Sequence, residues 1–198
     1  MTAILMALNE EYKFIAVADR ASTYNDDQYY TTARSKLKLA DKCVWAAAGV
    51  GVYDDILHAA KWSAKNVVKQ AWRHILQRKL LTRKCELLNA SSEAEIDLAV
   101  LVYAAEQLYI LDDEDMLLDP VREQFATIGS GGTLLEAYFA ASTRSLNNAL
   151  NAIHYTASKL PDAVRGPFDI IFENAAGHFE TRCDDPFARV WGPDAEPA

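Results

Sequence analysis

The first fifty residues carry the pattern that most restricts how this chain folds. Two short apolar runs, residues 4–8 and 14–18, are joined by a polar turn at residues 9–11. Two such runs around a turn predict a β-hairpin. The first strand begins almost at the start of the chain, so we expect removal of the initiator Met1 to leave Thr2 as the terminal residue beside it.

Two more strands are predicted in the same region. Residues 33–39 form a third run with a basic start, and residues 44–48 form a small-residue run that ends at Gly49. Residues 21–32, between the second and third strands, are polar, and we interpret them as a loop. The beginning of the chain therefore predicts four strands before the first helix.

The middle of the chain is predicted to be helical and then extended. Residues 52–119 contain no glycine or proline, and apolar residues from Ile56 onward repeat at the spacing of one helix face. This spacing predicts one bent helix or two stacked helices. Basic residues near the far end suit the C-terminal end of the helix dipole, or a partner surface. Three strands are then predicted, at residues 96–103, 107–111 and 116–118, and residues 124–128 lead to a glycine-rich turn.

The last third of the chain repeats this order of elements. A helix over residues 134–141 and a second helix, capped by Ser145 and ended by Pro161, precede a final hairpin at residues 168–173 and 178–181. The order along the chain is strands, paired helices, strands, paired helices and strands. This order suits two packed antiparallel sheets with a helix layer on each outer side. The chain is therefore predicted to belong to the α+β class.

Length and composition argue against several classes of protein. The 198 residues suit one domain, predicted over residues 1–183, with a Pro- and acid-rich tail at residues 184–198. The formal net charge of −8 argues against nucleic-acid binding. No apolar run reaches the roughly 20 residues of a membrane-spanning helix, and we expect no signal peptide. Three widely spaced cysteines, Cys43, Cys85 and Cys183, suit a reduced, cytoplasmic protein.

No metal or cofactor is predicted. The four histidines, at positions 58, 74, 154 and 178, lack partners at ligand spacing, so zinc catalysis is not expected. Residues 112–115 are all acidic, and we interpret them as a turn in water rather than as a metal site. The chain has no Gly-rich phosphate loop, so we do not expect it to use ATP itself.

Several short motifs, taken in order, resemble one known family. The chain is similar to proteasome β-subunits and to the bacterial HslV peptidase in Thr2, Ala18-Asp19-Arg20, Lys36-Leu37, Ala48-Gly49, the Gly-Ser-Gly turn within residues 126–132 and the strand at residues 166–171. The resemblance extends from Thr2 to Asn174. It implies the fold of N-terminal-nucleophile hydrolases, a four-layer αββα sandwich of two antiparallel sheets flanked by helix layers.

The resemblance also implies a function. It implies a threonine endopeptidase that cleaves peptides or unfolded proteins inside a homo-oligomeric ring, with a separate ATPase unfoldase as a possible partner. Neither nucleic acid nor membrane is an expected partner. Two other functions stay open. One is a catalytically silent ring or scaffold subunit, and the other is an amidase of the same fold that acts on small amides.

A nucleophile, its base and a tuning cation can be assigned by this resemblance. A threonine hydroxyl needs a base, and an N-terminal threonine such as Thr2 carries one in its own α-amine. A nearby cation lowers the pKa of that amine, and Lys36 is the candidate, held in place by Asp19. From the residues alone a surface ion pair is the simpler explanation of Lys36 and Asp19, whereas the resemblance favours the catalytic one.

Gly49, Ser130 and Asp162 complete the predicted catalytic residues. The backbone N–H of Gly49 is the candidate oxyanion donor, although a plain turn glycine before a helix explains its position equally well. By resemblance, Ser130 and Asp162 form hydrogen bonds near the terminal amine. Arg165 stands where the family usually has a serine, and by itself is expected to be solvated.

Two edges are predicted to hold an extended substrate. By resemblance these are Ala21-Ser22-Thr23 on one side and residues 49–51 on the other, and both would use main-chain hydrogen bonds. Ala21, Ala47 and Gly51 are the predicted pocket residues. Their small size predicts room for a large apolar side chain of the substrate.

Overall fold

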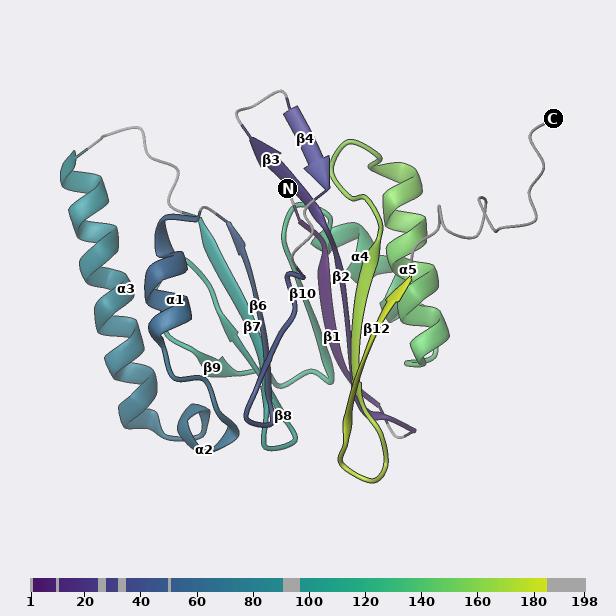
Figure 1. Cartoon of the computed structure of the whole chain (residues 1–198), viewed down its shortest axis with the longest axis horizontal. Helices are drawn as coiled ribbons and strands as arrows, with labels where there is room; N and C mark the ends of the chain where they lie inside the picture. The colour runs from purple at the N-terminus through teal and green to yellow at the C-terminus, as the bar shows by residue number, and fades with distance from the viewer. Residues whose placement is uncertain are drawn as a thin grey trace.

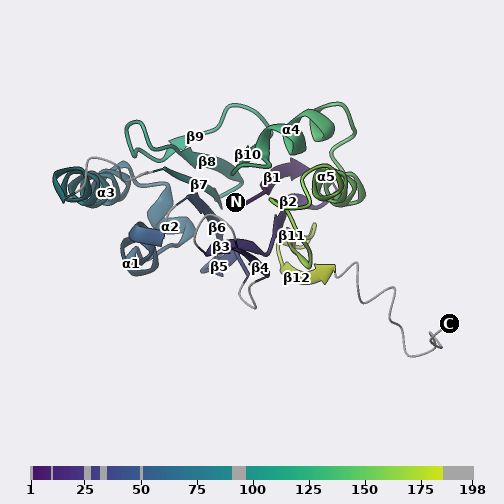
Figure 2. The ribbon, with the colours of Figure 1, turned by 90° about the horizontal axis from the view of Figure 1, so that it is seen from above.

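The structure has four layers, with two β-sheets packed face to face and helices outside each sheet (Figure 1). The computed structural model describes residues 2–9, 11–24, 28–31, 35–49, 51–90 and 97–184, with side chains for all of these except 22–24, 28–31 and 90. Nearly all of the predicted tail, residues 185–198, lies outside this part. Seen from above, α3 lies at one side of the molecule, the two sheets lie in the middle, and α5 lies at the other side (Figure 2).

One sheet combines strands from both ends of the chain. Its order is β10-β1-β2-β11-β12. Its strands are β1 (Ile4–Asn9), β2 (Lys13–Asp19), β10 (Phe125–Ile128), β11 (Phe168–Glu173) and β12 (Phe179–Asp184). β1 pairs antiparallel with β2 and β10, and β11 pairs antiparallel with β12. β11 joins β2 through a bridge of parallel type between Glu173 and Lys13.

The other sheet is antiparallel throughout, in the order β5-β6-β7-β8-β9. Its strands are β5 (Lys38–Ala40), β6 (Cys43–Gly49), β7 (Leu98–Ala104), β8 (Gln107–Leu111) and β9 (Asp119–Pro120). The hairpin predicted at residues 96–103 and 107–111 is confirmed as β7 and β8. Residue 96, the predicted start of its first strand, lies outside the described part.

The helices lie on the outer sides of the sandwich (Figure 1). Beside the second sheet lie η1 (Gly51–Tyr53), α1 (Asp54–Ala59), α2 (Ala64–Val67) and α3 (Gln70–Ala90), and beside the first lie α4 (Gly132–Ala140) and α5 (Leu146–Lys159). Ser145 caps α5 as predicted, because its Oγ accepts a hydrogen bond from Asn148 N at 3.2 Å. Among the described helices, none is long and apolar enough to cross a membrane.

Each boundary between layers has its own hydrophobic core. Ile4 and Met6 in β1 face the other sheet, whereas Leu5 and Ala7 face α4 and α5. Between the sheets, Phe14 stacks on Tyr103 with ring centroids 4.0 Å apart. Because both faces of these strands are covered, every position along them can be apolar, which explains the uninterrupted runs in the sequence. The predicted fold class is confirmed.

The segment predicted as a loop at residues 21–32 contains a two-stranded hairpin instead. β3 (Ala21–Tyr24) pairs antiparallel with β4 (Gln28–Thr31), and together they form a separate small sheet. In Figure 1 this hairpin extends past the ends of the main sheets, on the side where the chain begins. The prediction was wrong because threonine and tyrosine, which are frequent in this segment, favour strands.

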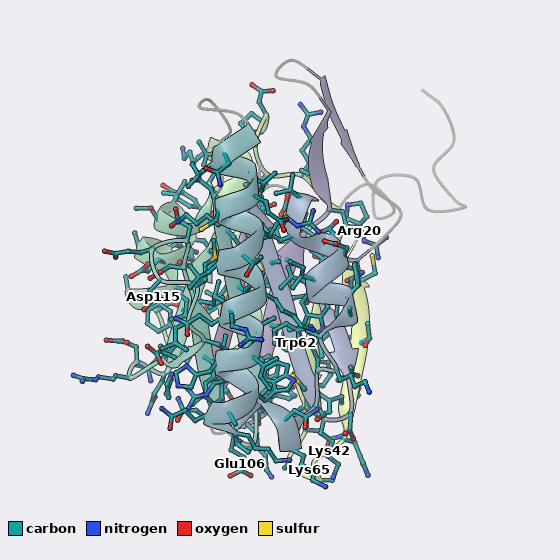
Figure 3. All side chains as sticks on the ribbon, turned by 90° about the vertical axis from the view of Figure 1, so that its left-hand side faces the viewer. Arg20, Lys42, Trp62, Lys65, Glu106 and Asp115 are labelled. Atoms are coloured by element: carbon teal, nitrogen blue, oxygen red, sulfur yellow. The ribbon has the colours of Figure 1, made fainter. Side chains whose placement is uncertain are left out.

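The long helix or helix pair predicted from residue 52 onward is divided into three short pieces and α3. Ala60 ends α1, and Ser63 caps α2 by accepting a hydrogen bond from Asn66 N at 3.2 Å. Trp62 lies between them, and its indole N–H donates to Leu57 O at 2.7 Å (Figure 3). A serine cap and a buried tryptophan therefore break the helix without glycine or proline.

The strand predicted at residues 116–118 does not form. Met116 has a φ of +57°, a left-handed conformation that strands do not adopt. Met116 and Leu118 are nevertheless buried, which accounts for their apolar character. Pairing with β8 begins only at Asp119, and Pro120 is part of the edge strand β9.

Candidate active site

Thr2 lies just before β1 and is held by the turn that follows β10. The backbone nitrogen of Thr2 donates to Ser130 Oγ at 3.2 Å, and its carbonyl oxygen accepts from Gly131 N at 3.0 Å. Gly129 has a φ of +91°, and a Cβ there would collide with the Thr2 carbonyl group. The predicted Gly-Ser-Gly turn therefore needs glycine at this point and lies against Thr2.

Lys36 connects Thr2 with Asp19. Its Nζ donates to Thr2 Oγ1 and to Asp19 Oδ1, each at 2.9 Å. Lys36 lies just before β5 in one sheet, and Asp19 ends β2 in the other, so the site spans both sheets. The Lys36 side chain is 15% exposed and that of Asp19 is fully buried. A surface ion pair, the simpler explanation from the residues alone, does not describe this contact.

Asp19 is held by three donors. Besides Lys36, Ala3 N donates to Oδ1 at 2.8 Å and Ala21 N donates to Oδ2 at 3.0 Å. Burial raises the pKa of Asp19, and the charge of Lys36 together with these hydrogen bonds acts against that rise. A carboxylate held by two backbone N–H groups has a fixed orientation, so it can fix the position of Lys36.

Burial lowers the pKa of Lys36 below the ordinary lysine value. The charge of Asp19, the hydrogen bond to it and the charge of Asp169 act against that fall. An ammonium group that donates to a hydroxyl oxygen stabilises the negative charge which that oxygen gains as it loses its proton. The contact of Lys36 with Thr2 can therefore assist a hydroxyl nucleophile.

Gly49 ends β6, opposite Leu98 of β7. It has a φ of +121°, and a Cβ at this position would collide with the backbone carbonyl of Asp97. These two local reasons require glycine here whether or not its N–H serves a substrate. Gly49 is exposed, and its assignment as oxyanion donor stays a prediction.

We expect Gly49→Ala to lower the free energy of unfolding by about 2 kcal/mol or more, because it adds backbone strain and a collision. For a chain of this length that is a fall of about 4–8 °C in melting temperature, measurable by circular dichroism. Gly51→Ala is the matched control, since a Cβ at Gly51 would meet Asp54 Oδ2 at 3.5 Å, an ordinary contact. Equal melting temperatures for the two variants would contradict the strain at Gly49.

The predicted substrate edges lie at β3 and at the end of β6. Ala21 begins β3 and is buried, and Ser22 and Thr23 continue the strand with side chains outside the described part. Ala47 is half-buried in β6 and packs against the core beneath α1 and α3, whereas Gly51 begins η1 and is exposed. Ala21 touches the site through its N–H, as described above. A pocket formed by these residues stays a prediction.

Asp162 lies apart from the hydrogen bonds of Thr2. It follows α5, its side chain is 78% exposed, and its Oδ1 accepts a hydrogen bond from Arg165 Nη2 at 3.1 Å. No hydrogen bond joins Asp162 to Thr2 within the described residues. The Arg165 carbonyl oxygen in turn accepts from Arg20 N at 3.3 Å, which places this turn beside the site. A role for Asp162 at the amine stays a prediction.

An ion pair that the sequence analysis does not single out lies next to the site. Arg20 Nε contacts both carboxylate oxygens of Asp169 at 3.0 Å, and Arg20 Nη2 contacts Asp169 Oδ1 at 2.5 Å. Asp169 is only 3% exposed. The sequence signal that could have indicated this pair is Asp169 itself, a carboxylate inside the apolar run of β11. A buried acid needs a charged partner, so such a residue predicts one.

Two described hollows lie away from Thr2. Two hollows of about 310 and 500 Å³ share Leu8, Asn9 and Gln124, at the end of β1 opposite to Thr2. Within the part of the chain that the structure describes, no group of three or more His, Cys, Asp or Glu side chains is placed to hold a metal ion.

Solved structures of other proteins share this fold. No family model matches the chain, and no curated protein matches it. HslV from Trypanosoma brucei is 17% identical, with a TM-score of 0.61 over 87% of this chain and 99% of that chain. The Gly-1 mutant of Anbu from Hyphomicrobium sp. strain MC1 is 12% identical, with a TM-score of 0.71 over 96% and 91% of the two chains.

A third similar structure is the helical assembly of the Anbu complex from Pseudomonas aeruginosa. It is 12% identical, with a TM-score of 0.69 over 96% of this chain and 90% of that chain. Likeness at these identities concerns the fold alone. The chain therefore has a proteasome-like αββα fold, as the sequence motifs imply.

Proposed function

We propose that the chain is a threonine peptidase in which Thr2 is the nucleophile once Met1 has been removed. The observation that carries this proposal is the partly buried contact of Lys36 Nζ with both Thr2 Oγ1 and Asp19 Oδ1. A buried lysine is costly, and two backbone N–H groups already satisfy Asp19. Perturbed charges of this kind cluster at functional sites, which favours a catalytic role.

The proposed base is the α-amine of Thr2. Removal of Met1 turns the Thr2 backbone nitrogen, 3.2 Å from Ser130 Oγ, into a primary amine. This amine accepts the hydroxyl proton, directly or through water, while Oγ1 bonds to the substrate's carbonyl carbon. The proton then passes to the leaving nitrogen as the C–N bond breaks. Water hydrolyses the ester left on Thr2 and restores the hydroxyl group.

Lys36 and Asp19 are proposed to tune this chemistry rather than to carry out a step of it. The Lys36 ammonium disfavours a second positive charge nearby, so it lowers the pKa of the Thr2 amine from its ordinary value of about 7.7–8.0. The free base then predominates near neutral pH. Asp19 orients Lys36, and the backbone N–H of Gly49 is the proposed donor to the oxyanion.

The proposed substrate is an extended peptide or an unfolded protein. The backbone groups of β3 and of the end of β6 offer hydrogen bonds to such a chain on two sides. We infer that copies of the chain assemble into a ring that encloses these sites, with a separate ATPase supplying unfolded substrate. The helical assembly of Anbu from Pseudomonas aeruginosa supports self-association of this fold.

A catalytically silent assembly subunit is the second candidate. The pairing of the Asp162 side chain with Arg165, instead of with the Thr2 site, favours it. An amidase acting on small amides would use the same chemistry, and it would differ in hydrolysing small amides but not longer peptides. The three functions separate on a single assay panel of a fluorogenic peptide, a small amide and an unfolded protein.

We expect protein from the native host to be lighter than the full chain by one methionine, because the initiator is removed when the second residue is as small as threonine. Intact mass spectrometry measures this loss. A peptide that carries an electrophile at its carboxyl end should then form a covalent adduct on Thr2. The same protein with Met1 retained is the control and should form no adduct. Peptide hydrolysis by protein that keeps Met1 would contradict the proposed base.

A further inference from the structure

The helix layer beside the second sheet carries charge that the Thr2 site does not use. α3 holds five basic residues and one acidic residue, although the whole chain has a net charge of −8. Leu76 and Leu80 bury one side of α3 in the core, so its opposite side faces away from the molecule. Figure 3 looks onto this outer side. The proposed function does not explain these charges, because the Thr2 site lies between the two sheets.

The flank of α3 that faces α1 has basic charge without a partner. Arg83 marks this flank, because it contacts Asp55 of α1 at 2.6 Å and Glu86 at 3.7 Å. Lys79 lies one helix turn before Arg83, and Arg78 is next to it; both are exposed. Among the residues that the structure describes, neither side chain contacts a carboxylate. A hollow of about 310 Å³ opens beside them, so an acidic side chain from another molecule has room there.

The opposite flank of α3 carries the acidic turn at residues 112–115. Lys84 Nζ and Gln77 Nε2 each donate to a backbone carbonyl oxygen of this turn. These contacts use the backbone only, and the four acidic residues are exposed. Within the described part of the chain, none of their carboxylates forms an ion pair. Figure 3 shows Asp115 on one side of α3 and Trp62, which precedes α2, on the other.

The strip of α3 between the two flanks is mostly uncharged. Ile75 is 58% exposed and lies one helix turn before Lys79. The exposed residues of this strip follow one another at spacings of three or four, the spacing by which one helix packs along another. They are Ala71, Ile75, Arg78, Thr82 and Cys85.

We propose that this surface of α3 binds a second copy of the chain, around a two-fold axis that runs parallel to the helix. Rotation about such an axis sets the basic flank of each copy against the acidic flank of the other. The charges also lie at the same height, because Arg78 and Lys79 lie between Gln77 and Lys84, the residues that hold the acidic turn. Each copy therefore supplies the carboxylates that the other copy's cations lack.

Two other arrangements fit the charges less well. A two-fold axis perpendicular to α3 sets basic flank against basic flank, and like charges across an interface are unfavourable. An acidic partner of another kind suits Arg78 and Lys79 but is repelled by residues 112–115 on the opposite flank. The contact does not involve Thr2, so it goes beyond the proposed function and stands or falls separately from it.

Reversing the charge of one flank tests the contact in the full-length chain. One variant combines Arg78→Glu with Lys79→Glu, and the other combines Asp113→Lys with Glu114→Lys. We expect the dissociation constant for pairing to rise by about 100-fold or more in each, because like charges then face each other. Since the contact joins copies in pairs, sedimentation velocity should give half the wild-type mass for each variant, whatever assembly other surfaces form.

Mixing the two variants gives the decisive result. In a pair made of one copy of each, the doubly acidic copy meets the doubly basic one on both flanks. An equimolar mixture should therefore recover the wild-type mass, and native mass spectrometry should show one copy of each variant in every pair. Wild-type mass in either variant alone, or a mixture that fails to recover it, would overturn the proposal.

The matched control combines Lys42→Glu with Lys65→Glu, which changes the net charge as much as the reversal on α3. Both lysines are exposed, at the end of the molecule opposite to Arg20 (Figure 3). This variant should keep the wild-type mass. Thr2→Ala should also keep it, so a protein that is inactive towards peptides still reports on the α3 contact.

Cys85 tests the direction of the axis. It is exposed on the uncharged strip, so an axis parallel to α3 sets it across from Cys85 of the second copy. Oxidation with copper phenanthroline should give a covalent dimer that Cys85→Ser abolishes and Cys183→Ser retains. If a charge-reversed variant fails to fold, the wild type decides, because its association should weaken between about 0.05 and 0.5 M salt. Association that is insensitive to salt, or no dimer through Cys85, would overturn the proposal.

Discussion

Thr2→Ala is expected to reduce hydrolysis of a fluorogenic peptide by about four orders of magnitude or more. The variant keeps the α-amine, Lys36 and Asp19, but it lacks the oxygen that forms the ester with substrate. Its backbone contacts with Ser130 and Gly131 do not involve the side chain, and it loses only the hydrogen bond from Lys36 Nζ to Oγ1, so its melting temperature should stay close to that of the wild type. The measurements are kcat/KM and thermal unfolding of the protein without Met1.

Thr2→Ser is the control for this loss, because it restores the hydroxyl group at the same position. We expect the serine variant to remain active and to form the same covalent adduct with an electrophilic peptide. Activity of Thr2→Ala at the wild-type rate would end the assignment of Thr2 as nucleophile. A mature wild-type protein that is inactive towards peptides and small amides would favour the silent assembly subunit.

The central strands of the two sheets were predictable from the sequence because both faces of each sheet are covered, which makes these strands continuous apolar runs. Residues 14–18 are apolar at every position because one face of β2 packs on the other sheet and the opposite face packs on α4 and α5. Residues 44–48 of β6 are apolar for the same reason, because one face of β6 packs against the core beneath α1 and α3 and the other face packs against the core between the sheets. The hairpin of β3 and β4 lacks this signal, since it pairs outside both main sheets.

Site residues that belong to a short sequence motif were predictable. Site residues that depend on a contact between distant parts of the chain were not. Lys36 and Asp19 were assigned by the order of their motifs, and the structure brings them together. Arg20 and Asp169 are 149 positions apart, so no local pattern could pair them before the fold was known. Asp162 illustrates a third case, because its exposed side chain pairs with its local neighbour Arg165, three residues away.

Lys36→Ala is expected to be inactive, as is Thr2→Ala. Unlike Thr2→Ala, it should also be clearly less stable than the wild type. Loss of the ammonium lets the Thr2 amine keep its proton at neutral pH and removes a donor from Oγ1, so we expect a loss of about three orders of magnitude in kcat/KM. Asp19 stays fully buried without its cation. An unbalanced buried charge costs about 3 kcal/mol, or about 6–12 °C in melting temperature.

Lys65→Ala is the matched control, because Lys65 is exposed on α2 at the end of the molecule opposite to Arg20 (Figure 3). It should change neither activity nor stability. Lys36→Arg keeps a cation beside Asp19 and should melt close to the wild type. It should still be nearly inactive, because a planar guanidinium does not reproduce the point contact of an ammonium with Thr2 Oγ1.

The stability lost in Lys36→Ala should shrink as the pH falls. Burial raises the pKa of Asp19 even beside Lys36, so without Lys36 the rise is larger. A carboxyl whose pKa is higher in the folded than in the unfolded chain contributes stability at low pH, and this is lost as the pH rises through the folded-state value. Melting temperatures of the variant and the wild type should therefore converge from about pH 7 towards about pH 4. A constant difference across this range would mean that Asp19 is not the group left unbalanced. Wild-type hydrolysis rates in Lys36→Ala from about pH 6 to about pH 9, the range in which a free α-amine titrates, would exclude Lys36 as the tuner of Thr2.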